Sequence, residues 1–453
     1  MKNTLFFGFA LLLLSSGESH AQAHIVDCVS LNTNMKHIES LADSGQYRQT
    51  LEPEKMPFFD FSKQGPFSDY LEYERNRILA ENPKGRLPCP IATSVSTHLY
   101  GDKSLQVVDL ISPFQLNAPK NKSEPTHRGV LLIHGLTDSP YLFHDLAEQF
   151  FQQGITVRTL LLPGHGTAPS ALVDVSHQQW RIATRYAVAA MLEDFDTVYL
   201  GGFSTGGALL IDYLNQHDLT VAEEAKIKGV MLWSPASRAK SSMAWAAQYM
   251  AWFKDYMESS GDIDFAKYES FPFNAAAQVH NLMQRIQPEK LTYVPDIPLF
   301  LVAAQADQTI DTQSTLSLLT HWHLSGARKS KEQDTMIYYG ENARLKSLSR
   351  SITVYNPTEC RGDDYCGSIK GISHTATTNA PTNPHYGWGG AYRNCEHLMG
   401  TDNYRVCKQT DTPILGETTV ETLHDTPQLQ RLTFNPYFEQ MTDALTQFIK
   451  ITQ

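Results

Sequence analysis

The sequence predicts an α/β protein with a mostly parallel central sheet and helices on both faces. After Pro125, short apolar segments with strand character alternate with longer segments that have helical spacing. Most of the strand-like segments are apolar throughout, which is typical of parallel strands covered on both faces. A Gly-x-Ser-x-Gly turn also lies between one such strand and the next helix. Together these features favour a layered α/β domain.

The predicted elements follow one another in a regular order. We expect strands at residues 105–110, 130–133, 155–162, 197–200, 229–233, 299–304 and 351–355. We expect helices at residues 70–79, 142–151, 177–191, 208–214 and 436–451. A capping box at Ser176–Gln179 opens the third of these helices, and Gly154 ends the second.

Residues 1–23 have the features of a signal peptide. Lys2 gives a positive start, Leu5–Leu14 form an apolar core, and small residues at 19–23 provide two cleavage signals. The apolar core is too short to cross a bilayer, and no other segment is long and apolar enough. We therefore expect a secreted or periplasmic protein without stable membrane insertion.

The cysteine content fits an exported protein. The sequence contains six cysteines, all after the leader: Cys28, Cys89, Cys360, Cys366, Cys395 and Cys407. Several connectivities are possible. We favour nearest neighbours, which gives Cys28–Cys89, Cys360–Cys366 and Cys395–Cys407. No Cys-x-x-Cys pair occurs and no closely spaced histidine pair lies beside the cysteines, so we expect no metal. We expect no cofactor either.

The charge balance excludes some partners. The net charge is −11, with 48 acidic and 37 basic residues and no long charged run. This balance argues against nucleic acid and against an anionic membrane surface as partners.

The turn Gly202–Gly207 carries the predicted nucleophile, Ser204. Between a strand and a helix, Gly-x-Ser-x-Gly forms a turn so sharp that only very small residues fit two positions to either side, here Gly202 and Gly206. The turn places the serine hydroxyl at a helix N-terminus, which favours developing negative charge. The backbone amide of Thr205 is one expected oxyanion donor, and that of Leu136, after the first long strand, is the other.

A serine nucleophile needs a base and an acid that follow it in the chain, each in a loop after a strand. Asp307, directly after the strand at 299–304, is the predicted acid. Asp311 is the alternative, although it is expected to begin the next helix. His374 is the predicted base. The rival histidines further along the chain are His385, His397 and His424.

These motifs resemble those of the α/β-hydrolase superfamily, in particular its monoglyceride lipases, lysophospholipases and bacterial carboxylesterases. The matching segments are 131–135, 162–167, 202–207, 306–311 and 372–374. The resemblance implies an α/β-hydrolase fold in which Ser204 is the nucleophile, Asp307 the acid and His374 the base. Two cysteine-bearing insertions, at 357–370 and 375–433, depart from the family pattern.

The domain organisation follows from this resemblance. We expect an N-terminal extension at 24–104 and a hydrolase domain at 105–453, with a helical cap inserted at about 237–296. The cap contains a dense apolar cluster that either lines an acyl-binding groove or packs the cap onto the core: Met243, Trp245, Tyr249, Met250, Trp252, Phe253, Tyr256 and Met257. The glycine-rich stretch 385–392 is expected to be a mobile loop near the pocket or an ordinary surface loop.

The leading hypothesis is hydrolysis of a carboxylic ester, with a small-molecule, lipid or polymer substrate, through an acyl-enzyme intermediate. An amidase or peptidase that uses the same residues is the second hypothesis. The third is a binding or adhesion protein on a hydrolase scaffold. It rests on Arg361-Gly362-Asp363, which lies between two cysteines.

Overall fold

The computed structural model describes residues 25–44, 56–63, 65–119, 127–216, 218–258, 261–326, 328–346, 348–357, 359–361 and 364–453. The predicted leader at 1–23 lies outside the described residues. Within the described ranges, no helix is both long and apolar enough to cross a bilayer.

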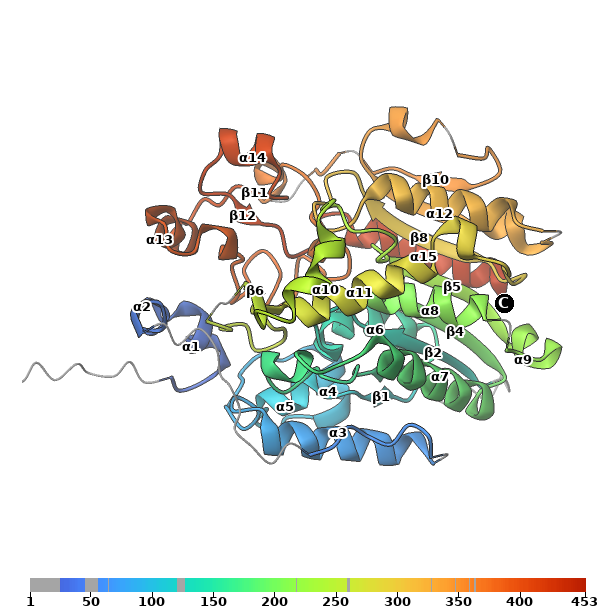
Figure 1. Ribbon diagram of the computed structural model, residues 1–453, viewed down its shortest axis with the longest axis horizontal. Helices are drawn as coiled ribbons and strands as arrows, with labels where there is room; N and C mark the ends of the chain where they lie inside the picture. The colour runs from blue at the N-terminus through green and yellow to red at the C-terminus, as the bar shows by residue number, and fades with distance from the viewer. Residues whose placement is uncertain are drawn as a thin grey trace, which may run out of the picture.

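A twisted sheet forms the centre of the molecule (Figure 1). In the described residues it has eight strands in the order β1-β3-β2-β4-β5-β8-β9-β10. The strands are β1 (Gln115–Leu116), β2 (Arg128–Ile133), β3 (Thr156–Leu160), β4 (Thr197–Phe203), β5 (Ile227–Trp233), β8 (Leu299–Ala304), β9 (Thr335–Tyr339) and β10 (Thr353–Tyr355). Only β1 runs antiparallel to its neighbour. The chain therefore has the predicted α/β-hydrolase architecture.

Helices cover both faces of this sheet because successive strand residues point to opposite sides. In β2, Leu131 and Ile133 belong to one apolar cluster, and Val130 and Leu132 belong to another. The first cluster includes α7 (His177–Asp194), α8 (Thr205–Asn215) and α12 (Thr312–Leu324). The second includes α6 (His144–Gln152) and α15 (Phe438–Thr452). Outside these layers, α9 (Val221–Lys226) leads into β5.

The predicted strands at 130–133, 155–162, 197–200, 229–233, 299–304 and 351–355 are confirmed, but the strand at 105–110 is wrong. Val107–Ile111 form helix α5, because their apolar side chains are buried at helical spacing and Asp109 accepts a hydrogen bond from the Gln106 amide at 2.7 Å. Sequence analysis also missed β9. This strand is buried and pairs with β8 and β10.

The N-terminal segment packs against the loops of the sheet. It contains α1 (Cys28–Thr33), α2 (Met35–Ser44), α3 (Phe67–Glu81) and α4 (Ser94–Tyr100). The Leu161 amide donates to the Tyr70 hydroxyl at 2.8 Å, and Arg77 donates to the His165 carbonyl at 2.9 Å. The Cys28–Cys89 disulfide fastens α1 to the chain before α4.

The segment between β5 and β8 lies where the cap is expected. It contains α10 (Ala247–Met250), β6 (Tyr256–Glu258), β7 (Phe271–Pro272) and α11 (Phe273–Arg285). In Figure 1, α10 and α11 lie next to each other across the middle of the molecule. Helix α11 also contacts α7 and α8, so the segment is anchored on the side of the sheet that carries these helices.

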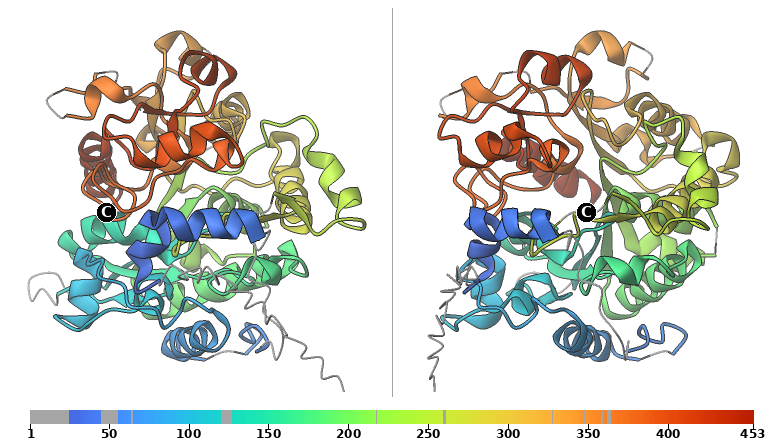
Figure 2. Two further views of the ribbon diagram at one scale, coloured as in Figure 1. Left: turned by 90° about the vertical axis from the view of Figure 1, so that its left-hand side faces the viewer. Right: turned by 60° about the vertical axis from the view of Figure 1, so that its left-hand side comes forward.

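The second insertion, residues 375–433, packs beside the N-terminal helices (Figure 2), where Arg405 pairs with Glu39 at 3.1 Å. Its elements are α13 (Asp402–Gln409), β11 (Leu415–Gly416), α14 (Val420–Asp425) and β12 (Gln430–Arg431). Disulfides Cys360–Cys366 and Cys395–Cys407 form as predicted.

The stretch 385–392 lies only partly on the surface, because Gly389 is exposed whereas three of its ring-bearing residues are buried. His385, Tyr386 and Tyr392 are buried, the first two bind Asp264 at 2.8 Å each, and Tyr392 donates to Glu269 at 2.8 Å. Buried aromatic rings with paired polar tips bind the cap segment to the insertion. Gly362 and Asp363 lie outside the described residues.

Candidate active site

Ser204 lies in the sharp turn between β4 and α8. Its backbone has φ 48° and ψ −112°, a region that non-glycine residues rarely adopt. A Cβ at Gly206 would lie 1.9 Å from the Ile133 carbonyl oxygen, and one at Gly202 would lie 2.5 Å from the Gly207 nitrogen. Glycine is therefore required at both positions for the turn to form. Such strain is typical of functional sites.

The structure brings three of the predicted site residues into one hydrogen-bonded chain. His374 Nε2 lies 3.0 Å from Ser204 Oγ, and His374 Nδ1 lies 2.7 Å from Asp307 Oδ2. The other oxygen of Asp307 accepts from the amides of Thr309 and Ile310 at 2.8 and 2.7 Å. Ser204, His374 and Asp307 are all buried. This is the arrangement in which a histidine can take the serine proton while a carboxylate orients the ring.

The alternative residues lie elsewhere. Asp311 caps the N-terminus of α12, where its side chain accepts from the Ser314 amide at 3.2 Å. His385 is bound to Asp264. His424 is exposed beside Asp425. Within the described residues, none of the rival histidines His385, His397 and His424 is hydrogen-bonded to Ser204.

The two expected oxyanion donors belong to residues that border one cavity with the nucleophile. Leu136 and Thr205 both line a cavity that also reaches Ser204 and His374. In the described part of the chain, neither amide donates a hydrogen bond to another residue. The loop of Leu136 is held by the Thr137 amide, which donates to His165 Nε2 at 3.1 Å. The position of Thr205 at the start of α8 adds the positive end of a helix dipole.

Asp138, in the same loop, was not singled out by sequence analysis. Its backbone amide donates a hydrogen bond to the Gly135 carbonyl at 3.3 Å. Burial raises the pKa of Asp138 to about 7, although the charges of Lys267 and His374 favour the ionised form. The buried carboxyl group therefore changes charge close to neutral pH beside the site. No sequence motif distinguishes it from an ordinary loop aspartate.

The cavity has a volume of about 550 Å³ and two kinds of lining. Its apolar side comes from the cap segment: Met243, Ala244, Ala247, Met250, Met257, Phe271, Phe273, Val279 and Met283. Its charged lining residues come from the loop of Leu136, the cap segment and the insertion: Asp138, Lys267, Glu269, Glu396 and Arg431. A molecule with an apolar part and a polar part fits such a cavity.

The apolar cluster of the cap divides into three groups. Its three methionines line the cavity. Tyr256 is buried, with 4% of its surface exposed. The other aromatic residues face solvent, and Trp252 and Phe253 are 81% and 83% exposed. Neither of the two expected alternatives describes the whole cluster, because the methionines line the cavity, Tyr256 is buried and the other four aromatic side chains are exposed.

Among the residues described, no group of three or more histidine, cysteine, aspartate or glutamate side chains could hold a metal ion.

Comparison with known proteins adds a family match. Residues 124–263 match the family described as "Serine aminopeptidase, S33". A thermostable monoacylglycerol lipase from Bacillus sp. (strain H-257) is 33% identical over 89 residues, which cover 20% of this chain and 35% of the relative. A carboxylesterase from Bacillus subtilis (strain 168) is 22% identical over 196 residues, which cover 41% of this chain and 75% of the relative. The chain thus spans about a third of the length of the first relative.

Solved structures of similar proteins include a soluble variant of monoglyceride lipase from Saccharomyces cerevisiae, with 12% identity, a TM-score of 0.41 and coverage of 55% of this chain and 82% of that one. Another is monoacylglycerol lipase from Paleococcus ferrophilus, with 16% identity, a TM-score of 0.38 and coverage of 57% and 94%. The sheet has the α/β-hydrolase architecture, and over these segments the chain is similar to the S33 family, to a monoacylglycerol lipase and to a carboxylesterase.

Proposed function

We propose that the protein is an exported serine hydrolase that cleaves carboxylic esters through an acyl-enzyme intermediate. The observation that carries the proposal is the chain of hydrogen bonds from Ser204 through His374 to Asp307 at the edge of the cavity. The names of the two bacterial relatives support an ester rather than another acyl substrate.

In the first half of the reaction, His374 Nε2 takes the proton of Ser204 as Oγ attacks the ester carbonyl carbon. The carbonyl oxygen becomes an oxyanion, which the amides of Leu136 and Thr205 stabilise. His374 then gives the proton to the alcohol oxygen as the carbon–oxygen bond breaks. The acyl group remains on Ser204, and the alcohol leaves.

In the second half, a water molecule replaces the alcohol. His374 accepts a proton from this water, which attacks the acyl carbon, and the proton then returns to Ser204 Oγ as the carboxylic acid leaves. Asp307 holds the imidazole ring in position and stabilises its positive charge in both steps.

The two-sided cavity supports a substrate with an apolar acyl group. The methionines and phenylalanines of the cap suit an acyl chain, because unbranched methionine side chains adapt to irregular shapes. The charged side of the cavity then faces the alcohol part of the ester. A lipid, short-chain or polymeric ester satisfies this description.

Amide hydrolysis is the second candidate function, because the matched family is described as a serine aminopeptidase. The same hydrogen-bonded residues serve an ester or an amide, and only the leaving group differs. Export, to the periplasm or outside the cell, is supported by the leader-like residues 1–23 and by three disulfides, which persist in oxidising compartments.

The test is hydrolysis of p-nitrophenyl esters from short to long acyl chains by the wild type, Ser204→Ala and His374→Ala, with an aminoacyl p-nitroanilide as the amide substrate. We expect ester turnover that falls by at least about 10⁴-fold in both variants. Ester turnover that persists in Ser204→Ala would contradict the proposal. Amide turnover well above ester turnover in the wild type would favour the peptidase.

A further inference from the structure

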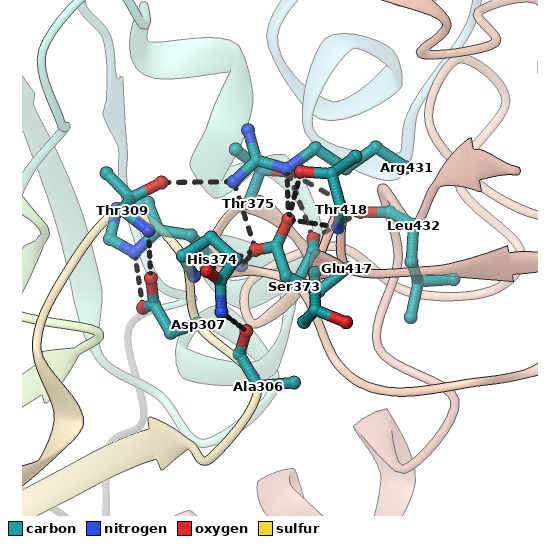
Figure 3. A network of polar contacts seen from close by, with 12 residues as sticks. Ala306, Asp307, Thr309, Ser373, His374, Thr375, Glu417, Thr418, Arg431 and Leu432 are labelled. Atoms are coloured by element: carbon teal, nitrogen blue, oxygen red, sulfur yellow. Dashed lines mark hydrogen bonds and ion pairs between the residues drawn. The ribbon is translucent and has the colours of Figure 1, made fainter. Parts of the chain in front are cut away.

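A glutamate of the 375–433 insertion contacts the backbone of the proposed catalytic histidine. Glu417 Oε2 accepts a hydrogen bond from the His374 amide at 3.1 Å and one from the Gln308 amide at 3.4 Å. Gln308 directly follows Asp307. One carboxylate oxygen therefore joins the loop that holds the histidine to the loop that holds its acid partner (Figure 3).

Arg431 holds this carboxylate in place. Its Nε donates to Glu417 Oε1 at 2.8 Å, and its Nη2 donates to Oε2 at 3.0 Å. The same Nη2 donates to Thr309 Oγ1 at 3.0 Å. The Thr309 amide also donates to Asp307. Thr309 therefore links the Arg431 guanidinium to the proposed catalytic acid. A two-pronged contact of this kind fixes direction as well as distance.

A small sheet places the two charged residues opposite each other. Strands β11 and β12 run parallel, with Gly416 paired to Arg431, and Glu417 follows β11 directly. The Leu432 amide donates to the Gly416 carbonyl at 2.8 Å, and the Lys370 amide donates to the Leu415 carbonyl at 2.7 Å. The sheet is thus attached to the chain just before His374, so the pair and the histidine loop belong to one framework.

Glu417 stays ionised although it is fully buried. Burial by itself opposes ionisation, but the charge and hydrogen bonds of Arg431, with those of the Thr418 and His374 amides, outweigh burial and lower the pKa of Glu417 to about 2. The carboxylate therefore keeps its full capacity as an acceptor over the whole range in which a histidine base works.

We propose that Glu417, oriented by Arg431, is a positioning residue that sets the distance and angle between His374 and Asp307. The inference rests on the proposed function of these residues. Glu417 does not touch the reacting atoms. It acts on them through the backbone amides of His374 and Gln308, and this support comes entirely from an insertion that departs from the family pattern.

The physical reason is geometric. His374 lies at the start of a short 3₁₀ turn, His374–Ala376, rather than within a strand or a long helix, so no regular backbone hydrogen bond fixes its amide. Catalytic groups must be held within a fraction of an ångström of the productive arrangement, and an error of about 1 Å costs about 100-fold in rate. An ionic acceptor for the amide of such a residue restricts its backbone where the local structure does not.

The experiment compares Glu417→Gln, which keeps the shape and removes the charge, with Glu417→Asp, which keeps the charge and withdraws it from the His374 amide by one methylene. The control is Glu421→Gln, an exposed carboxylate in the same insertion. Three quantities are measured for each: kcat and KM with the best p-nitrophenyl ester, the rate at which a fluorophosphonate labels Ser204, and the thermal unfolding midpoint.

We expect kcat and the labelling rate of Glu417→Gln to fall about 10- to 100-fold, with KM within about threefold of wild type. In Glu417→Asp, kcat and the labelling rate should fall by a smaller factor, and the thermal unfolding midpoint should stay near that of wild type. In Glu421→Gln, all three quantities should equal those of wild type. If Glu417→Gln does not fold, the kcat and labelling rate of Glu417→Asp test the positioning role instead.

Wild-type kcat and labelling in folded Glu417→Asp and Glu417→Gln would overturn the positioning role and leave the proposed function intact. A rise in KM with unchanged kcat would also overturn it, because such a change reports substrate binding rather than alignment. A wild type that neither turns over any ester or amide nor reacts with the fluorophosphonate would instead reject the proposed function, and the inference with it.

Discussion

The central sheet and the 375–433 insertion hold their proposed catalytic groups in different ways. Ser204 follows β4, whose neighbours β2 and β5, like β4 itself, bury almost every side chain in two apolar clusters. His374 is held from the insertion by Glu417, which is charged and fully buried, and by its partner Arg431, which is partly buried. One side of the site therefore rests on close packing and the other on ionic hydrogen bonds.

The difference predicts which kind of substitution each region tolerates least. Close-packed strands tolerate changes of pH but not of volume, because no free space absorbs an added atom. A buried ion pair depends on the charge of both partners, and loss of one leaves the other uncompensated. The site should therefore be sensitive to added bulk on the side of Ser204 and to lost charge on the side of His374.

Gly206→Ala should have the largest effect on the sheet side. Its new Cβ would lie 1.9 Å from the Ile133 carbonyl oxygen, so the turn that carries Ser204 must move. We expect kcat/KM to fall by at least about 100-fold and the free energy of unfolding to fall by about 3 kcal/mol. Ester kinetics and urea unfolding measure the two quantities.

The matched control is Gly389→Ala, whose added Cβ meets nothing within 4 Å. This variant should resemble the wild type in both measurements. A Gly206→Ala protein with wild-type kinetics would show that the packing around the turn is looser than the structure indicates, and the contrast between the two regions would disappear.

The charge of Glu417 should appear in the pH dependence of stability. Its pKa is about 2 in the folded protein against an ordinary value of 4.5. Because the folded value is the lower one, the stabilisation is fully present above pH 4.5 and is lost as the pH falls toward 2. The difference corresponds to about 3 kcal/mol in the free energy of unfolding.

Urea unfolding between pH 3 and pH 6 tests this expectation. The wild type should exceed Glu417→Gln by about 3 kcal/mol at pH 6 and by about half of that or less at pH 3. Two stability curves that remain parallel over this range would mean that Glu417 does not carry the expected charge contribution.

Loss of the Cys395–Cys407 disulfide should have a smaller effect than either of these changes. The bridge closes a loop with a sequence separation of 12, which predicts a cost of up to about 3 kcal/mol, although measured costs are often smaller. The Arg431 amide donates to the Asn394 carbonyl at 2.9 Å, so the bridge also supports β12. Cys395→Ser/Cys407→Ser should therefore lower kcat severalfold as well as stability.

Cys360→Ser/Cys366→Ser is the comparison for this variant, because that bridge spans only six residues and its cysteines are not neighbours of Arg431. It should lower the free energy of unfolding by about 2 kcal/mol and leave kcat unchanged. Equal effects of the two double variants on kcat would argue against a specific role for β12.

Sequence analysis described the sheet well because buried parallel strands give short, continuous apolar runs. It assigned Leu105–Leu110 to a strand because Val107, Val108 and Leu110 have strand-forming character, whereas tertiary burial and the cap at Gln106 favour a helix there. Strand β9 was missed because its five residues follow a charged stretch and form no longer pattern. Local propensity does not decide such short segments.

Sequence analysis could select Ser204, Asp307 and His374 as site candidates because each follows a predicted strand in the order that the fold requires. It could not select Glu417 and Arg431. They are 14 positions apart in an irregular insertion, and only the pairing of β11 with β12 brings them together. The partial burial of stretch 385–392 was missed for a similar reason, since its partners Asp264 and Glu269 belong to the cap segment.

The location of the Glu417–Arg431 pair bears on when the protein becomes active during synthesis. All three residues of the hydrogen-bonded chain are made before residue 375, and the sheet can begin to assemble around them as they emerge. The support for the His374 loop must wait until Arg431 has been made and β11 has paired with β12. A nascent chain would therefore carry Ser204 before the framework that positions His374 is complete.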